Sequence, residues 1–311
     1  MNLKHVSFFT MMILGLFLSS CEKEENDLTP DNNEKQGKIE LEITDAPVDD
    51  PAVKSVFVTF ADVQIDGQSL PGFTPVSIDL SSYTNGATYL LGGDSAKVGT
   101  YNDVTFILDP EECYVQDTED NKHLLNPEDT HLTLDYEFEL EQDSTVKLLV
   151  DFDLRKSIQR NTSDSTDRYD FVPTADLVNS LRIMDKSVTG ELKGSVADGS
   201  TGSDVIVAYL YAKGTYDAST EMEEDGDTGL QFKNAISSAL VQADGSYYFP
   251  YLESGEYELH LASYDTDGTS QQVQFRGMLE VNSVLADLLD IQIQSSASTE
   301  IDLSIIGLLP L

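Results

Sequence analysis

The sequence predicts an all-β protein with two β-sandwich domains, because apolar and polar residues alternate along most of the chain after residue 36. The clearest alternation runs through 132–140, where Leu, Tyr and Phe alternate with Thr, Asp and Glu. No segment sustains a long amphipathic helical repeat, and turns rich in Gly, Asp and Ser separate many short strands. We therefore expect stacked sheets, with short helices only at 153–160 and 283–289.

The first 20 residues have the pattern of an export leader. Lys4 supplies a positive charge, an apolar run follows at 6–18, and small residues precede Cys21. The apolar run is too short to span a bilayer as a helix. We predict that residues 1–20 are a signal peptide, cleaved between Ser20 and Cys21.

The motif Leu18-Ser19-Ser20-Cys21 resembles the lipobox of bacterial lipoproteins. The resemblance implies that the Cys21 thiol receives a diacylglycerol and that the new amino terminus is also acylated. Two or three acyl chains anchor a protein stably, so the lipid bilayer is the first expected partner. The alternative is an ordinary cysteine that ends an uncleaved apolar helix.

Residues 21–36 are predicted to be a disordered acidic tether, because Leu28 is the one hydrophobic residue after the cysteine. The cluster Lys23-Glu24-Glu25 resembles signals that export lipoproteins of one Gram-negative phylum to the outer leaflet of the outer membrane. A plain solvated linker is the alternative. We expect an outer-membrane location, facing either the cell surface or the periplasm.

The chain carries a net charge of −38 at pH 7. Nucleic acid and anionic headgroups require a basic surface, so we expect neither as a partner. There are two cysteines, and Cys113 has no disulfide partner if Cys21 carries lipid. We interpret Cys113 as a buried filler and not a nucleophile, because Glu111 and Glu112 would raise its pKa.

Residues 37–186 are predicted to form the first sandwich domain. The alternating runs 132–140 and 146–154 flank a short turn and are expected to pair as a hairpin. Residues 175–183 have the composition of a last strand before a boundary at 184–189.

This first half resembles the lipoprotein family catalogued as domain of unknown function 4382. The resemblance rests on motifs that occur in order, among them Thr44-Asp45-Ala46-Pro47, Val56-Phe57-Val58-Thr59-Phe60, Gly99-Thr100-Tyr101, and Asp151-Phe152-Asp153 with Ser157. It implies no activity. The acidic stretch 164–170 departs from the family pattern.

Residues 187–311 are predicted to form a second sandwich. Its expected strands are 205–211, 235–242, 247–251, 257–262, 272–281, 291–294 and 301–306. An Asp244-Gly245 turn tolerates positive φ, and Tyr247 with Phe249, or alternatively Tyr248, should pack inward. The run from Ala243 to Leu259 resembles carboxypeptidase regulatory-like, transthyretin-type sandwiches, which implies binding or display more than chemistry.

The sequence offers no catalytic residue, cofactor motif or metal motif. His131 and His260 fall on the polar sides of strands, where we expect solvated rings, and His123 lies in a loop without a second ligand nearby. Carboxylates are too abundant for any acid–base pair to stand out. A carboxylate-dependent hydrolase remains an alternative, and it requires two converging acids in a deep cleft.

Three acidic loops are candidates for a weak calcium site, although none has EF-hand spacing. They are Asp265 to Gly268, Glu223 to Asp227, and Asp45 with Asp49 and Asp50. Solvated acidic loops are the alternative interpretation.

Five tyrosines crowd one region of the second half and are candidates for stacking on sugars. They are Tyr247, Tyr248, Tyr251, Tyr257 and Tyr264. Strand alternation should turn roughly half of them into a core.

Taken together, the lipobox, the strand periodicity and the lack of a catalytic motif lead us to expect a non-enzymatic, membrane-anchored envelope protein that serves as a binding, adhesion or structural module. A glycan-binding accessory protein is the alternative. Its partner, an extracellular or periplasmic protein or glycan, is not specified.

Overall fold

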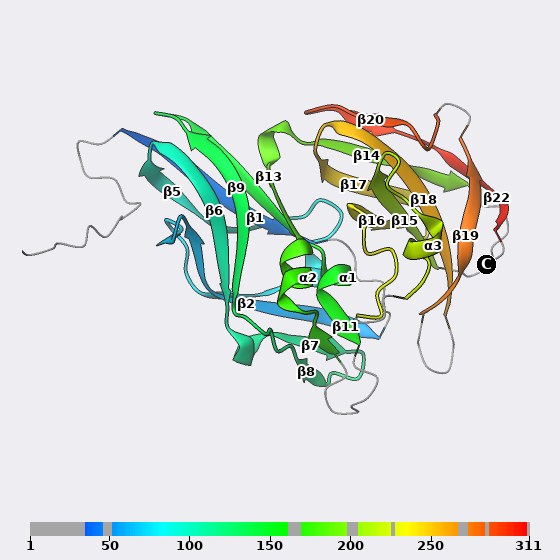
Figure 1. The fold of residues 1–311 in the computed structure, drawn as a ribbon, viewed down its shortest axis with the longest axis horizontal. Coiled ribbons are helices and arrows are strands. Elements are labelled where there is room, and N and C mark those ends of the chain that lie inside the picture. The colour runs from blue at the N-terminus through cyan, green and yellow to red at the C-terminus, as the bar shows by residue number, and fades with distance from the viewer. Residues whose placement is uncertain are drawn as a thin grey trace, which may run out of the picture.

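The computed structural model describes residues 35–45, 52–160, 169–197, 205–224, 228–266, 273–283 and 286–309. Strands dominate these ranges, so the all-β prediction is confirmed. Two bodies of strands lie side by side, and the short helices α1 (Leu154–Ser157) and α2 (Thr174–Asn179) lie between them (Figure 1). Within these ranges no helix is both long enough and apolar enough to cross a bilayer.

The predicted leader, the cleavage residue Ser20, the lipid attachment residue Cys21 and nearly all of the tether lie outside the described residues. The division of the chain at residues 186 and 187 stays a prediction.

The N-terminal half consists of two facing sheets. The first has the order β13-β10-β1-β5, built from β1 (Gln36–Thr44), β5 (Tyr89–Lys97), β10 (Thr145–Phe152) and β13 (Leu181–Asp185). The second has the order β8-β7-β2-β6-β9, built from β2 (Val53–Ile65), β6 (Gly99–Leu108), β7 (Tyr114–Asp117), β8 (Lys122–Leu124) and β9 (His131–Leu140). Strands β3 (Gln68–Ser69) and β4 (Val76–Asp79) also pair with β2, while β11 (Ile158–Arg160) and β12 (Tyr169–Phe171) form a separate ribbon.

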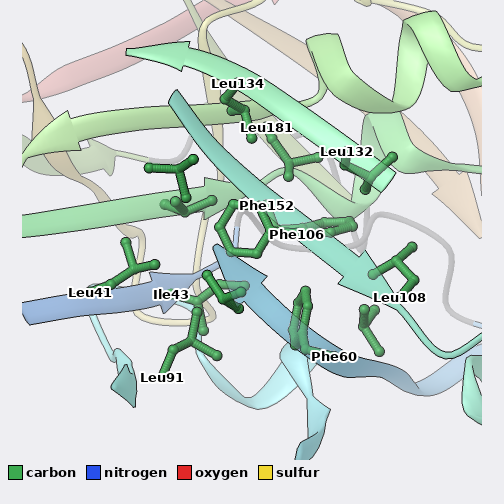
Figure 2. Close-up of a cluster of buried hydrophobic side chains, with 14 of the residues drawn as sticks. Leu41, Ile43, Phe60, Leu91, Phe106, Leu108, Leu132, Leu134, Phe152 and Leu181 are labelled. Atoms are coloured by element: carbon green, nitrogen blue, oxygen red, sulfur yellow. The ribbon is translucent and has the colours of Figure 1, made fainter. Parts of the chain in front are cut away.

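The core of this half fills the space between the two sheets. Leu41 and Phe152 from the first sheet point toward Phe60, Phe106 and Leu132 from the second (Figure 2). All five are fully buried. Burial of a side chain of this size stabilises the fold by about 1.5–3 kcal/mol, so the period-two pattern has a direct energetic basis.

The predicted hairpin between 132–140 and 146–154 is wrong. Strand β9 pairs with β6 in the second sheet, whereas β10 pairs in parallel with β1 and antiparallel with β13 in the first. The chain crosses between the sheets after β9, where Ser144 O accepts a hydrogen bond from Lys38 N at 2.8 Å. Both strands still face the same core, and this shared face is all that their alternation encoded.

The helix predictions are partly wrong. Within 153–160 only α1 is helical, and 175–183 divides into α2 and β13 instead of forming one strand. The described residues of 283–289 contain no helix. Helix α3 (Ala218–Glu221) was not predicted. Elements of one turn leave no measurable period in a sequence, which explains these errors.

The C-terminal half is one nine-stranded sheet whose main path is β16-β15-β18-β19-β22-β14-β17. Its strands are β14 (Gly190–Ala197), β15 (Val205–Ala212), β16 (Ser237–Leu240), β17 (Ser246–Leu252), β18 (Gly255–Thr266), β19 (Val273–Asn282), β20 (Ile291–Ile293), β21 (Ser298–Glu300) and β22 (Leu303–Leu308). All seven predicted strands are present with shifted ends.

The two ends of this path meet, because β16 and β17 are joined by a tight turn. Gln242 N donates to Ser246 O at 2.8 Å, and Gly245 has the positive φ (+85°) predicted for the Asp-Gly turn. The sheet therefore curls around its own core, where Tyr247 and Phe249 are buried as predicted.

A second layer covers the outer face of the curled sheet. Tyr209 on β15 stacks on Phe232 with ring centroids 4.3 Å apart, and Tyr211 donates to the buried Glu221 carboxylate at 2.8 Å. Strand β15 is thus buried on both faces.

Gly194→Ala should destabilise the protein, because β14 crosses the chain at Ile301 without room for a side chain. A Cβ at Gly194 would lie 1.8 Å from Ile301 O, and Ile301 N donates to Lys193 O at 2.9 Å on the same crossing. We expect a loss of about 1–3 kcal/mol in the free energy of unfolding, measured by urea denaturation. The control is Gly255→Ala, whose Cβ meets nothing closer than 3.5 Å. Equal stability of the two variants would contradict the crossing.

Candidate functional site

Helix α1 carries two cations that bond to the other half of the molecule. Arg155 donates through one terminal nitrogen to Gln231 O and Phe232 O, both at 3.2 Å. Lys156 Nζ donates to Ala235 O at 3.0 Å. The Arg155 side chain is only 3% exposed, so water has almost no access to its guanidinium group.

The buried Asp153 carboxylate is the shared acidic partner of both cations. Its oxygen lies 3.4 Å from Arg155 and 3.3 Å from Lys156, and the side chain also caps α1 by accepting from Lys156 N. Burial acts to raise the Asp153 pKa, but the two cations outweigh it and lower the pKa below the ordinary value. The carboxylate is therefore ionised at neutral pH and holds the cations in place.

A second group of contacts extends the junction along β13 and the residues after it. Arg182 donates to Tyr251 O at 3.2 Å while it pairs with Asp151 at 2.9 Å. Lys186 pairs with Glu42 and lies 5.2 Å from the centre of the Tyr251 ring. In return, the Tyr251 hydroxyl donates to Gly86 O at 2.7 Å.

The motif residues on which the family resemblance rests support this junction. Asp45 accepts a hydrogen bond from Leu154 N at 3.0 Å and so fixes the start of α1 to the end of β1. Ser157 donates to Asp153 O at 2.6 Å. Asp45, Asp153 and Ser157 are all buried. These motif residues act as scaffold, because they orient α1 and its cations.

The histidines do not share one environment. His131 is exposed, as predicted. The prediction of a loop position for His123 is wrong, because His123 lies on β8, is buried, and its Nε2 is 3.0 Å from Asp117 Oδ2. Burial acts to raise the Asp117 pKa, but the bonds from His123 and Asn121 lower it.

The prediction of a solvated His260 ring is also wrong. The imidazole stacks on Tyr216 with ring centroids 3.9 Å apart and is 17% exposed. The alternation along β18 placed the ring correctly, opposite Leu259 and Leu261, but the second layer covers that face.

Cys113 is fully buried, which confirms its interpretation as a filler. Burial, with smaller contributions from Asp109 and Glu112, raises the pKa of the thiol to about 11. The sulfur accepts a hydrogen bond from Thr59 N at 3.3 Å. The thiol is therefore protonated at neutral pH.

The three calcium candidates do not gather ligands among the described residues, where no cluster of three or more His, Cys, Asp or Glu side chains could hold a metal ion. Asp45 is buried against α1, while Glu223, Glu224 and Asp265 are exposed. The remaining acidic residues of these candidates, Asp49, Asp50, Asp225, Asp227 and Asp267, lie outside the described residues.

The five tyrosines do not form an exposed platform. Tyr247, Tyr257 and Tyr264 are buried, and Tyr248 and Tyr251 are half-buried. Tyr248 donates to Glu191 at 2.6 Å, and its ring lies against Gly86 of the other half. The hydroxyl groups of four of these tyrosines form hydrogen bonds within the C-terminal half, and that of Tyr251 bonds across the junction to Gly86 O.

Two cavities lie beside these elements. The larger, of about 560 Å³, is in the C-terminal half; its walls include Tyr216, Met222, His260, Leu261, Met278, Glu280, Ala286, Asp287, Leu288 and Leu309. The smaller, of about 310 Å³, lies between the halves and is lined by Lys156, Asp176, Asn179, Ser180, Thr228, Leu230, Lys233 and Asn234.

Sequence reasoning missed the junction and both cavities. One usable signal was the nearly continuous apolar run 205–211, which indicates a strand covered on both faces and hence a second layer. No local pattern marks Arg155 as buried, because its partners at Gln231 and Phe232 are far away in sequence.

Comparison with known families supports the assignment of the first half. Residues 36–173 match the family model described as "Domain of unknown function (DUF4382)", which confirms the resemblance predicted for this part of the chain. No curated protein matches the chain.

Solved structures give only distant similarities. The Bacillus anthracis TIE protein is 13% identical with a TM-score of 0.19; the match covers 86% of this chain and 34% of that one, so this chain spans about a third of its length. The major pilin subunit BcpA of Bacillus cereus is 9% identical, with coverages of 88% and 70% and a TM-score of 0.22. The minor pilin GBS52 of Streptococcus agalactiae is 11% identical, with coverages of 88% and 97% and a TM-score of 0.21. At these TM-scores none of them supports an inference about this chain.

Arg155→Met should weaken the junction strongly, because it removes the guanidinium and leaves the buried Asp153 carboxylate with Lys156 alone. We expect a loss of about 3–5 kcal/mol in the free energy of unfolding by urea denaturation. The control is Lys193→Met, which removes an exposed cation that lies 3.4 Å from Glu191 and should cost less than about 1 kcal/mol. A small effect at Arg155 would show that the junction contributes little.

Proposed function

We propose that this protein is a membrane-anchored lipoprotein of the cell envelope that acts without catalysis as a binding, adhesion or structural module. The observation that carries the proposal is the junction, where Arg155 and Lys156 bond to backbone carbonyls of the other half. Such contacts hold two strand bodies in one fixed arrangement, which suits a protein that displays a surface or transmits a mechanical load.

The environments of the ionisable groups support a non-catalytic role. A hydrolase that uses carboxyl groups needs one with a raised pKa inside a cleft. Among the described carboxyl groups, a raised pKa is resolved for Asp103, through partial burial and then the nearby Asp66 and Asp135. Asp103 lines neither of the two cavities. The buried Asp153 and Glu221 carboxylates are occupied with structural hydrogen bonds.

The anchor is proposed from the Leu18-Ser19-Ser20-Cys21 motif. Strand β1 begins at Gln36, so the tether ends one residue earlier than predicted. With lipid on Cys21, residues 22–35 would form a tether of roughly 20 Å root-mean-square length, or about 50 Å when fully extended. The net charge of −38 disfavours direct contact with anionic headgroups. We therefore propose an outer-membrane location in which the acyl chains alone hold the protein.

We further infer that residues 187–311 are related to carboxypeptidase regulatory-like sandwiches, on the strength of the Asp244-Gly245 turn and the strand after it.

Cys21→Ser should move the protein from the membrane fraction to the soluble fraction, because no thiol remains to receive the diacylglycerol. Fractionation of cells, with mass spectrometry of the extracted protein, measures both the location and the acyl mass. Cys113→Ala is the control and should stay membrane-bound and acylated. A Cys21→Ser protein that is still cleaved after residue 20 and still membrane-bound would refute the anchor.

Glycan binding is the second candidate function, favoured by the polar cavity between the halves. Amide, hydroxyl and amine groups from both halves line it, and such groups hydrogen-bond sugar hydroxyls. Asn179 on α2 is exposed in this cavity and has no role in the junction contacts described above.

Asn179→Ala should reduce retention on a glycan array if this cavity binds sugar, because it removes an amide donor and acceptor. Asn102→Ala, at an exposed site outside both cavities, is the control. Unchanged retention in the Asn179 variant would place any glycan site elsewhere.

A further inference from the structure

The larger cavity lies where the C-terminal sheet forks. Strand β18 pairs with β19 from Ala262 onward but with β20 at Gly255 to Tyr257. Between these stretches β19 leaves β18 and continues alongside β22. The segment around Leu288 enters the fork, and its Leu288 O accepts a hydrogen bond from Leu259 N at 2.9 Å. The fold thus builds an opening of about 560 Å³ into the sheet, within the size range of small-molecule sites.

The walls of this cavity are largely apolar. Leu261, Met278 and Leu288 contribute aliphatic and thioether surface, and the stacked rings of Tyr216 and His260 form an aromatic wall. Methionine side chains adapt their shape to a bound group. An apolar ligand body would therefore find complementary surface.

Among the described residues, two buried polar atoms at the aromatic wall have no hydrogen-bond partner. They are the Tyr216 hydroxyl oxygen and His260 Nε2, whose nearest carboxylate oxygen, on Glu258, lies 3.6 Å away. Burial lowers the pKa of His260, and Glu258 opposes this shift only in part, so the ring is neutral at pH 7. Both atoms are covered, so a ligand in the cavity would meet the carbon surface of the two uncharged rings, and this wall offers no positive charge to hold an anion.

The charges around the cavity have one sign. Glu280 and Asp287 line it and are exposed, Glu258 lies 3.6 Å from His260 Nε2, and the described lining residues include neither Lys nor Arg. A carboxylate ligand would be repelled, whereas an ammonium group would be attracted both by the acids and by the aromatic faces.

We propose that this cavity binds a small apolar amine, whose hydrocarbon body lies between Leu261, Met278 and Leu288 and whose ammonium group lies against the Tyr216 and His260 rings, near Glu280 and Asp287. This site lies apart from the junction and from the polar cavity between the halves, so the inference goes beyond the proposed function.

Methionine methyl NMR of the full-length protein in detergent tests the site directly. Met222 and Met278 line the cavity, whereas Met184 is buried in the N-terminal half and serves as an internal control. The probes are hexylamine, hexanol and hexanoate, which share one hydrocarbon body and differ in the head group. We expect hexylamine to shift the Met222 and Met278 signals saturably without moving Met184, and to bind at least tenfold more tightly than hexanoate. Hexylamine that gives no saturable shift, or binds no better than hexanoate or hexanol, would overturn the proposal.

Two variants locate the ligand. Ala286→Phe fills the cavity and should weaken hexylamine binding at least tenfold, while Asp287→Asn removes one of the acids that line it and should weaken binding about fivefold. Ala243→Phe, in an exposed turn outside the cavity, should leave binding unchanged. An unchanged midpoint of urea denaturation shows that each variant is folded. If Ala286→Phe binds hexylamine as well as the unmodified chain does, the ligand does not occupy this cavity.

Discussion

The buried Arg155–Asp153 pair is the interaction on which the arrangement of the two halves depends. A charge taken out of water is costly unless it is paired and its remaining hydrogen-bonding groups are satisfied. Asp153 supplies the countercharge, and carbonyls of Gln231 and Phe232 accept from the guanidinium. The guanidinium reaches these carbonyls only when the C-terminal half is in place, so the burial of this pair is coupled to the position of the other half.

Basic residues are scarce in this chain, yet four of them lie at the junction between the halves. The sequence has 18 Lys and Arg residues against 56 Asp and Glu residues, so two acidic bodies would repel each other at close range. Arg155, Lys156, Arg182 and Lys186 lie at the contact, and each has an acidic partner in its own half. Their donors reach carbonyls and an aromatic ring across the junction. Attraction across the boundary therefore does not require a basic surface on the second half.

Sequence reasoning worked where a property is local and periodic. The strands of the second half, the Asp244-Gly245 turn and the burial of Cys113 follow from alternation, backbone preference and composition. It failed where the answer depends on which strands become neighbours. The runs 132–140 and 146–154 show that two strands can share a core face and still belong to different sheets. His260 shows that a ring on the polar side of a strand can be covered by a segment that carries few apolar residues of its own.

The sequence by itself determined that the chain is built of strands and that the first half has a recognisable family pattern, because strand periodicity and motif order are properties of neighbouring residues. Only the tertiary structure decided that Asp153 and Ser157 serve a junction and that β18 and β19 separate to open a cavity. These features arise from contacts between residues far apart in the chain. Such contacts are selected by packing and by the pairing of buried charges, and neither leaves a mark in a short stretch of sequence.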